Sequence, residues 1–259
     1  MFVFGLILAV FVGITLGLVG SGGSILTVPI FVYVFGVDPV LATAYSLFAI
    51  GATSIIGGVK GFIHKDVDFD KLLKFGIPSM ISVFLTRKFI VPLIPDHLNL
   101  FGHTVAQEVV LMVLFAMLML FAAYAMFQEI SIPHTKFPFL TILLKGVFVG
   151  SVTGIVGAGG GFLIIPALTN FFNLSMKKAV ATSLVLIAIN SILGLLGDWR
   201  RIELFDWNLL LLYTLLTIVG IFIGFFISNK IDGMKLKRIF SMGIMAVAIF
   251  VLLTEFGVI

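Results

Sequence analysis

Apolar residues gather in ten stretches along the chain, separated by polar or proline-containing breaks. The stretches run over residues 2–19, 24–36, 39–58, 72–94, 104–127, 139–157, 161–173, 177–197, 207–228 and 235–256. A membrane-spanning helix needs about 20 residues, because each residue advances ~1.5 Å across a hydrocarbon core about 30 Å thick. Eight stretches approach that length, whereas 24–36 and 161–173 are too short. The pattern therefore predicts an all-α transmembrane bundle of eight long helices and two short half-helices.

The two short stretches occupy corresponding places in a sequence repeat that is offset by 137 residues. The first copy reads GLVGSGGS at 17–24, and the second reads GIVGAGGG at 154–161. The same offset pairs Pro29 with Pro166, Ala44 with Ala181, Ser46 with Ser183, and Ser54 with Ser191. Apolar bias aligns leucines by chance, but it does not align glycines, a proline and serines in one register. We therefore interpret the chain as a duplicated unit.

The two repeats span residues 1–128 and 138–259, with a polar linker at 129–137. If each broken pair of helices is a hairpin, each repeat crosses the membrane an odd number of times and the second repeat is inverted. If each pair is one interrupted helix, the repeats are parallel. With the 59–74 loop inside, the inverted arrangement leaves 12 Lys and Arg inside and 4 outside, against 8 and 8 for the parallel one. Because basic residues concentrate in cytoplasmic loops, we expect an inverted-topology repeat with both termini outside.

The composition indicates that lipid is the solvent. Of the 259 residues, 61% are hydrophobic and 11% are charged, and a soluble core could not hide so much apolar surface. The net charge of +4 comes from Lys and Arg between the apolar stretches, so we expect the lipid bilayer as a partner and no nucleic acid. Because the chain has no cysteine, thiolate metal sites are excluded. We expect neither a cofactor nor a metal, and a homodimer is one assembly that the sequence allows.

The glycine-rich breaks at 20–24 and 157–161 are the strongest candidates for a binding site. Adjacent glycines do not continue a stable helix, and a break is tolerated in lipid only where protein or water surrounds it. The helix after each break begins with free N–H groups and the positive end of its dipole, which together attract an anion. We expect the two breaks to converge near the membrane midplane. The alternative is close helix packing through small residues.

Hydroxyl and amide side chains on the helices after the breaks add neutral hydrogen-bond donors. Ser46 and Ser54 are eight residues apart and share a helix face, and Asn190 is the most polar residue deep in a stretch. Hydrogen bonding between helices is the alternative role. The candidate substrate-binding residues are Ser21, Gly22, Gly23, Ser24, Thr43, Ser46, Gly159, Gly160, Gly161, Thr182, Ser183 and Asn190. We also expect Pro29 and Pro166 to interrupt the helices that carry them.

No catalytic residue is predicted. Buried Asp, Glu or His residues usually mark proton relays, but none lies clearly in the middle of a stretch, and all four histidines fall in or near loops. The first break lacks the Lys-Ser/Thr pair of a phosphate-binding P-loop. Without a deep Lys or Arg, the expected substrate is a weakly basic, low-charge anion held by dipoles and hydroxyls. The sequence therefore predicts a transporter rather than an enzyme.

The doubled motif resembles the TauE/SafE family of sulfite exporters. The resemblance rests on the glycine motifs at 17–24 and 154–161, on their prolines, and on the Ala-x-Ser-Leu and Ala-Thr-Ser-Leu segments at 44–47 and 181–184. It implies a permease in the plasma (inner) membrane of a prokaryote that moves sulfite, sulfoacetate or related sulfonates. Two alternatives stay open. One is an anion channel of the same architecture, and the other is a transporter of a different small organic anion.

Overall fold

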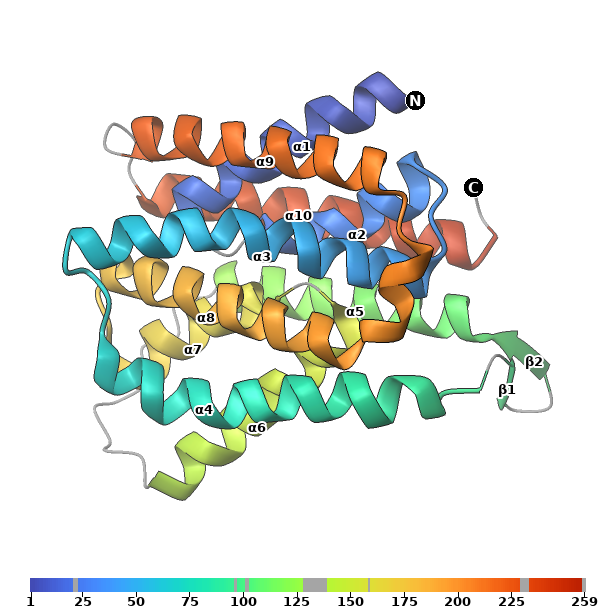
Figure 1. The fold of residues 1–259 in the computed structure, drawn as a ribbon, viewed down its shortest axis with the longest axis horizontal. Coiled ribbons are helices and arrows are strands. Elements are labelled where there is room, and N and C mark those ends of the chain that lie inside the picture. The colour runs from blue at the N-terminus through green and yellow to red at the C-terminus, as the bar shows by residue number, and fades with distance from the viewer. Residues whose placement is uncertain are drawn as a thin grey trace.

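The computed structural model describes residues 1–20, 23–95, 97–100, 103–127, 139–157, 159–228 and 233–257, and these are nearly all helical (Figure 1). The first part of the chain contains α1 (Phe2–Val19), α2 (Ser24–Pro29), the π-helical η1 (Ile30–Val34), α3 (Pro39–Ile63), α4 (Phe69–Leu85), the π-helical η2 (Thr86–Ile90), η3 (Val91–Leu93), β1 (His97–Leu100), β2 (His103–Ala106) and α5 (Gln107–Phe127). The second contains α6 (Phe139–Val156), α7 (Gly161–Phe172), α8 (Met176–Gly197), η4 (Trp199–Leu204), α9 (Trp207–Ser228) and α10 (Gly233–Glu255).

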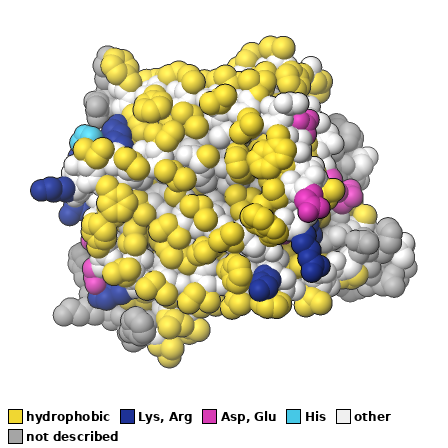
Figure 2. Space-filling view, viewed as in Figure 1, with side chains coloured by type: hydrophobic (Ala, Val, Ile, Leu, Met, Phe, Trp, Pro, Cys, Tyr) yellow, Lys and Arg dark blue, Asp and Glu magenta, His cyan; other side chains and the backbone are white. Residues whose placement is uncertain are grey.

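Helix length and surface chemistry both indicate a multi-pass membrane protein. Six described helices are long and apolar enough to cross a bilayer, and three shorter apolar helices accompany them, at Ser24–Val34, Leu140–Val156 and Ser241–Glu255. On the face in Figure 2, hydrophobic side chains cover the middle, while most charged side chains lie toward the two ends of the helices. This distribution matches a hydrocarbon layer with water on either side.

One short element departs from the apolar pattern. Residues 103–106 form β2, which pairs antiparallel with β1 in the register His97–Ala106 and Leu100–His103. The helix expected to start at residue 104 therefore begins at Gln107. Valine and threonine in this segment favour an extended backbone, and the hairpin lies at the end of the bundle beyond α4 and α5 (Figure 1).

Both glycine-broken pairs fold back as hairpins. The rings of Phe2 and Phe35 lie 5.7 Å apart, so the start of α1 and the end of η1 are at the same end of the bundle. In the other pair, Gly146 of α6 and Phe172 of α7 both contact Phe75, which places the outer ends of these two helices together. Neither pair is one interrupted helix.

The prolines in the short helices that follow the two glycine breaks have different effects on the backbone. Pro29 is the last residue of α2, and the chain continues as a π-helical turn from Ile30. Proline has no N–H to donate, so a change of hydrogen-bond register after it is expected. Pro166 lies inside α7, which continues to Phe172. The expectation that Pro166 interrupts its helix is therefore wrong, although proline lacks the N–H that another residue at this position would donate within the helix.

Glycines bring two pairs of helices into backbone contact. Along α1 and α9, a Cβ added at Gly17 would lie 2.5 Å from the Ile221 carbonyl oxygen. Along α6, a Cβ added at Gly150 would collide with the carbonyl oxygen of Ser79 in α4, and one at Gly154 would lie 2.7 Å from Cβ of Thr86, the first residue of η2. This is the close packing through small residues that holds membrane helices together. It explains the glycines that precede each break.

Helices α3 and α8 run antiparallel through the centre of the bundle (Figure 1). Gly51 packs on Ser191, and Gly61 packs on Ala181. Helices α5 and α10 form a further pair. The start of α3 therefore meets the end of α8, and this junction is where the second break lies.

We predict that Gly150→Leu destabilises the protein, whereas Gly243→Leu does not. A side chain at Gly150 would push α6 away from α4, and such overpacking costs about 1–3 kcal/mol or more. A Cβ at Gly243 meets nothing within 4 Å. Thermal unfolding of the two variants in detergent, followed by size-exclusion chromatography, measures the difference. Equal midpoints would contradict the assigned packing.

Candidate functional site

The second glycine break is a tight left-handed turn inside the bundle. Gly157, Gly159 and Gly160 have φ angles of 73°, 64° and 72°, which favour glycine over all other residues. Leu163 and Ile164 both donate backbone hydrogen bonds to the Gly160 carbonyl oxygen, which starts α7. The N–H groups that precede them belong to the first turn, where a helix supplies no internal acceptors.

Side chains from three other elements surround this break. A Cβ added at Gly157 would collide with Thr43 of α3 and with Nη2 of Arg87 in η2. A Cβ at Gly159 would lie 3.2 Å from the Ser191 hydroxyl oxygen on α8. The Ser191 hydroxyl is buried and has no hydrogen-bond partner. The break therefore lies among polar atoms rather than in a dry helix contact.

Arg87 is the largest fully buried side chain near the break, with 0% exposure. Its Nη1 donates to Oδ2 of Asp198 at 2.6 Å and to the Thr43 hydroxyl at 2.9 Å. The Thr43 hydroxyl donates its own proton to the Val40 carbonyl oxygen, so its lone pairs are available to Arg87. The Nε and Nη2 atoms of Arg87 are buried without a partner.

Asp198 connects this arginine to a second one. Its Oδ1 accepts a hydrogen bond from Nη1 of Arg201 at 3.0 Å, and its side chain is nearly buried. Arg201 also lines a cavity of about 430 Å³, together with Asp38 and Glu108. The chain Arg87–Asp198–Arg201 thus runs from the second break to a polar cavity at one end of the bundle.

The sequence interpretation missed this cluster. The expectation of no deep Lys or Arg is wrong, because Arg87 is fully buried. The available signal was that Arg87 falls within the apolar stretch 72–94. An ionisable residue inside a membrane segment is a functional candidate by default.

The structure brings some predicted site residues to this break and places others elsewhere. Thr43 contacts Gly157, and Ser46 is buried on the same helix without a hydrogen-bond partner. Asn190 donates through Nδ2 to the Ser79 hydroxyl at 3.1 Å, and its Oδ1 has no partner. Thr182 and Ser183 lie near the opposite end of α8, where they bond the Asp68 N–H and the Val180 carbonyl oxygen.

The first break is less polar in the described residues. Gly20 has a φ of 84° and packs on Val180, and Gly23 packs on Thr15 of its own hairpin. Ser24 and Gly161 are buried at the starts of α2 and α7, and these two helices contact each other. Ser21 and Gly22 lie outside the described residues.

The expectation that the two glycine breaks converge near the membrane midplane is wrong. Gly157 contacts Thr43, whereas Gly20 contacts Val180, whose neighbour Ala181 packs on Gly61. Thr43 and Gly61 are 18 residues apart on α3, which corresponds to roughly 27 Å. Helices α1 and α6, which precede the two breaks, therefore end at opposite ends of the α3–α8 pair. The short helices that follow the breaks, α2 and α7, contact each other.

A second polar cavity, of about 460 Å³, lies at the end of the bundle near Gly20. Its lining includes Gly17, Lys60, His64 and Lys177. The Lys60 ammonium lies 3.7 Å above the Phe225 ring, and Lys177 pairs with Asp66 at 2.9 Å. Polar cavities with basic residues thus lie at both ends of α3.

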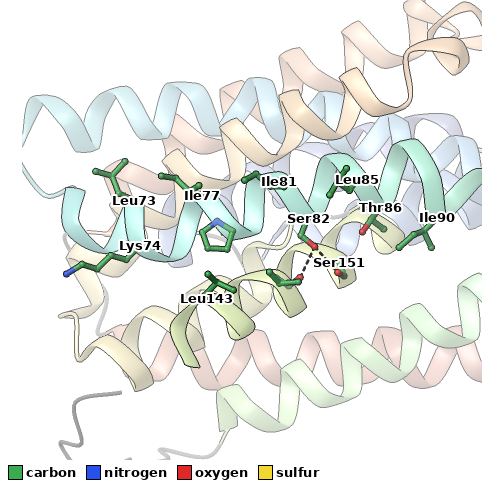
Figure 3. Close-up of a pocket in the computed structure, with 12 residues that line it drawn as sticks. Leu73, Lys74, Ile77, Ile81, Ser82, Leu85, Thr86, Ile90, Leu143 and Ser151 are labelled. Atoms are coloured by element: carbon green, nitrogen blue, oxygen red, sulfur yellow. Dashed lines mark hydrogen bonds between the residues drawn. The ribbon is translucent and has the colours of Figure 1, made fainter. Parts of the chain in front are cut away.

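A groove of about 690 Å³ between α4 and α6 has a different character (Figure 3). Exposed apolar side chains such as Leu73, Ile77 and Ile81 line it. Its main polar groups are satisfied, since the Ser82 hydroxyl contacts the Ser151 hydroxyl at 2.8 Å and donates to the Val147 carbonyl oxygen. The groove faces the surface of the bundle, and Lys74, which also lines it, pairs with Asp70 at 2.7 Å. Within the described residues, no cluster of three His, Asp or Glu side chains could hold a metal ion.

We predict an asymmetric response when the buried ion pair is broken. Asp198→Ala leaves the buried Arg87 with only Thr43, and loss of one partner of a buried pair costs about 3–5 kcal/mol. Arg87→Met costs less, because Asp198 keeps Arg201. The double variant Arg87→Met with Asp198→Ala should have a higher melting midpoint than Asp198→Ala alone, because it leaves neither member of the pair buried without its partner. Melting midpoints in detergent test this order, and a lower midpoint for Arg87→Met than for Asp198→Ala would contradict it.

Comparison with known proteins gives the family. A model described as "Sulfite exporter TauE/SafE" matches residues 5–251. A probable membrane transporter protein of Xylella fastidiosa is 27% identical over 251 residues, which cover 93% of this chain and 91% of the relative. One of Methanocaldococcus jannaschii is 34% identical over 125 residues, or 44% of this chain and 46% of the relative. No solved structure matches significantly. Because the family model covers nearly the whole chain, this protein belongs to the TauE/SafE sulfite exporter family of membrane transporters.

Proposed function

We propose that the protein is a secondary transporter for small sulfur-containing oxyanions such as sulfite, sulfoacetate or related sulfonates, in the plasma membrane of a prokaryote. The family description and the transporter names of the relatives support the class of protein. The substrate class is supported by the charge and hydrogen-bonding character of the second break.

The observation that carries the proposal is the buried polar lining of this break. Arg87 supplies a positive charge with two N–H-bearing nitrogens that have no partner, and Ser191 supplies a hydroxyl next to Gly159. Unpaired polar groups inside a membrane protein cost several kcal/mol each and mark substrate pathways. An oxyanion is the ligand that complements a cation, a hydroxyl and helix N–H groups together.

An inverted repeat is supported by the way each half packs on the other. Gly20 contacts Val180. The repeat equivalent of Gly20 is Gly157, which contacts Thr43, and Thr43 lies 137 residues before Val180 and is therefore its repeat equivalent. Likewise α1 packs along α9, while α6 packs along α4. A two-fold relation between the halves produces such exchanged contacts, and hairpins at the start of each half give the odd number of crossings that inversion needs.

Alternating access follows naturally from this arrangement. The cavity beside Arg201 and the cavity beside Lys60 lie at opposite ends of α3, and the arms α2 and α7 meet between them. The second candidate, an anion channel, shares this architecture. Saturable counterflow exchange in liposomes identifies a carrier, whereas ohmic single-channel currents identify a pore.

We predict that Gly159→Ala weakens transport of a labelled sulfur oxyanion at least about tenfold, which corresponds to about 1.4 kcal/mol. The added Cβ would lie 2.8 Å from Ile187 and 3.2 Å from the Ser191 hydroxyl, where the anion is proposed to bind. Counterflow in proteoliposomes with labelled sulfite, sulfoacetate and methanesulfonate measures the apparent affinity.

Gly36→Ala is the matched control for this experiment. Gly36 has a similar φ of 70°, but a Cβ there meets nothing within 4 Å. Gly36→Ala therefore introduces similar backbone strain without a new contact, and its transport affinity should stay near that of the native protein. If both variants transport as the native protein does, the second break is not the binding site. If the native protein moves none of the three anions, the substrate class is wrong.

The inverted arrangement with both termini outside gives a separate prediction about labelling. Lys65 lies in the α3–α4 turn, and Glu203 lies in η4, one residue from the repeat equivalent of Lys65. Because the chain has no cysteine, Lys65→Cys and Glu203→Cys each introduce a single reactive thiol. A membrane-impermeant maleimide should label Glu203→Cys in intact cells, and Lys65→Cys only after permeabilisation. Labelling of both from the same side would indicate parallel repeats.

A further inference from the structure

We propose that the Nε–Nη2 edge of Arg87 is the subsite that recognises the transported anion, by binding two oxygens of one oxyanion group. Thr43 and Asp198 act as positioning residues that hold the guanidinium. This inference rests on the proposed function and deepens it, because it names the residue that selects oxyanions over ions with a single acceptor atom.

The guanidinium is fixed at one of its three nitrogens. Nη1 donates to both Thr43 and Asp198, at 2.9 and 2.6 Å. The Arg87 Cβ lies against α8, since a Cβ added at Gly197 would be 2.7 Å from it. With its stem and Nη1 held, the planar group cannot turn its remaining N–H groups toward another partner.

The opposite edge of the same group is free. Nε and Nη2 are buried without a hydrogen-bond partner, and Nη2 faces Gly157, where any side chain would collide with it. Gly157 therefore covers this edge with backbone alone at the point where α6 ends and the turn toward α7 begins, and an anion binds there when this turn moves aside. Two parallel N–H groups on a planar cation match two oxygens of a sulfite, sulfonate or carboxylate group.

The charges around Arg87 suit an anion. The cluster holds two positive groups, Arg87 and Arg201, and one negative group, Asp198, so its net charge is +1. Arg201 bonds the second oxygen of Asp198, so the carboxylate shares its negative charge between two arginines and neutralises Arg87 less completely. A buried cation with unpaired N–H donors attracts a negative charge strongly, because the protein surroundings screen the interaction little.

Arg201 lines a cavity of about 430 Å³, together with Asp38 and Glu108. Asp198 stands between that cavity and Arg87, bonded to both arginines. Asp198 holds Arg87 in place, so an anion does not reach the guanidinium past these contacts, and the carboxylates of Asp38 and Glu108 disfavour its entry from this end. The cluster therefore closes the cavity side and leaves Nη2 of Arg87 facing Gly157.

Substitution by lysine tests the subsite, because lysine keeps the charge but lacks a two-donor edge. Purified native protein, Arg87→Lys and the matched control Arg200→Lys are titrated with sulfite, methanesulfonate and bromide, and the thermal midpoint is followed. Arg200 is exposed on η4. We expect Arg87→Lys to bind both oxyanions at least about tenfold more weakly, with its bromide response unchanged. The control should match the native protein.

Two further variants separate recognition from folding. Asp198→Asn keeps an acceptor for Nη1 and should retain the preference for oxyanions over bromide, whereas Asp198→Ala frees the guanidinium and should lower that ratio. If Arg87→Lys does not fold, the neutral pair Arg87→Gln with Asp198→Asn replaces it, since removing both charges of a buried pair is tolerated better than removing one. Native oxyanion affinity in this pair would overturn the proposal.

The outcomes distinguish this inference from the proposed function. If the native protein is stabilised by no sulfur oxyanion and transports none, the proposed function fails. If the native protein responds and Arg87→Lys responds with equal affinity, the proposed function stands and the assignment of Arg87 is wrong. A weaker response that is equal for oxyanions and bromide would also overturn the two-oxygen subsite.

Discussion

A guanidinium buried in a membrane-embedded bundle must find its partners in the protein, because lipid offers none. Arg87 meets this constraint because five segments of the chain come together around it. The π-helical turn η2 carries the arginine, α3 supplies Thr43, the end of α8 supplies Asp198, η4 supplies Arg201, and the turn between α6 and α7 supplies Gly157. The π-helical register is part of this arrangement, since such turns redirect side chains and are frequent at functional sites.

Glycine has two separate physical roles in this fold, and they lie next to each other in the sequence. Gly150 and Gly154 are helical and allow α6 to touch α4, whereas Gly157, Gly159 and Gly160 adopt left-handed angles that turn the chain. The packing and functional interpretations of the motif are therefore not alternatives. Backbone contact fixes the hairpin in place, and the fixed hairpin presents its turn to Arg87.

The apolar pattern predicted the broken pairs and the approximate ends of most helices, because these depend on local composition. It could not predict the burial of Arg87, whose partner Asp198 is 111 residues away. Helix periodicity gives the face of a residue but not its depth relative to another helix. For this reason Thr182 and Thr43 both looked like site residues, although only Thr43 lies at the second break. The hairpin at 97–106 was missed because it is too short to show a periodicity.

The two halves are similar in sequence but differ at the points where charge matters. The repeat offset places Gly224 opposite Arg87 and Gly197 opposite Lys60, so the first half carries both basic residues and the second half has glycine at both equivalent positions. Arg87 is buried in an ion pair, whereas Lys60 lies over an aromatic ring beside an open cavity. Identical halves would hold an anion equally at both breaks. The anion subsite proposed at Arg87 depends on this asymmetry, because the second half has glycine at the equivalent position. Transport would then require that the affinity of this subsite changes as the bundle changes shape.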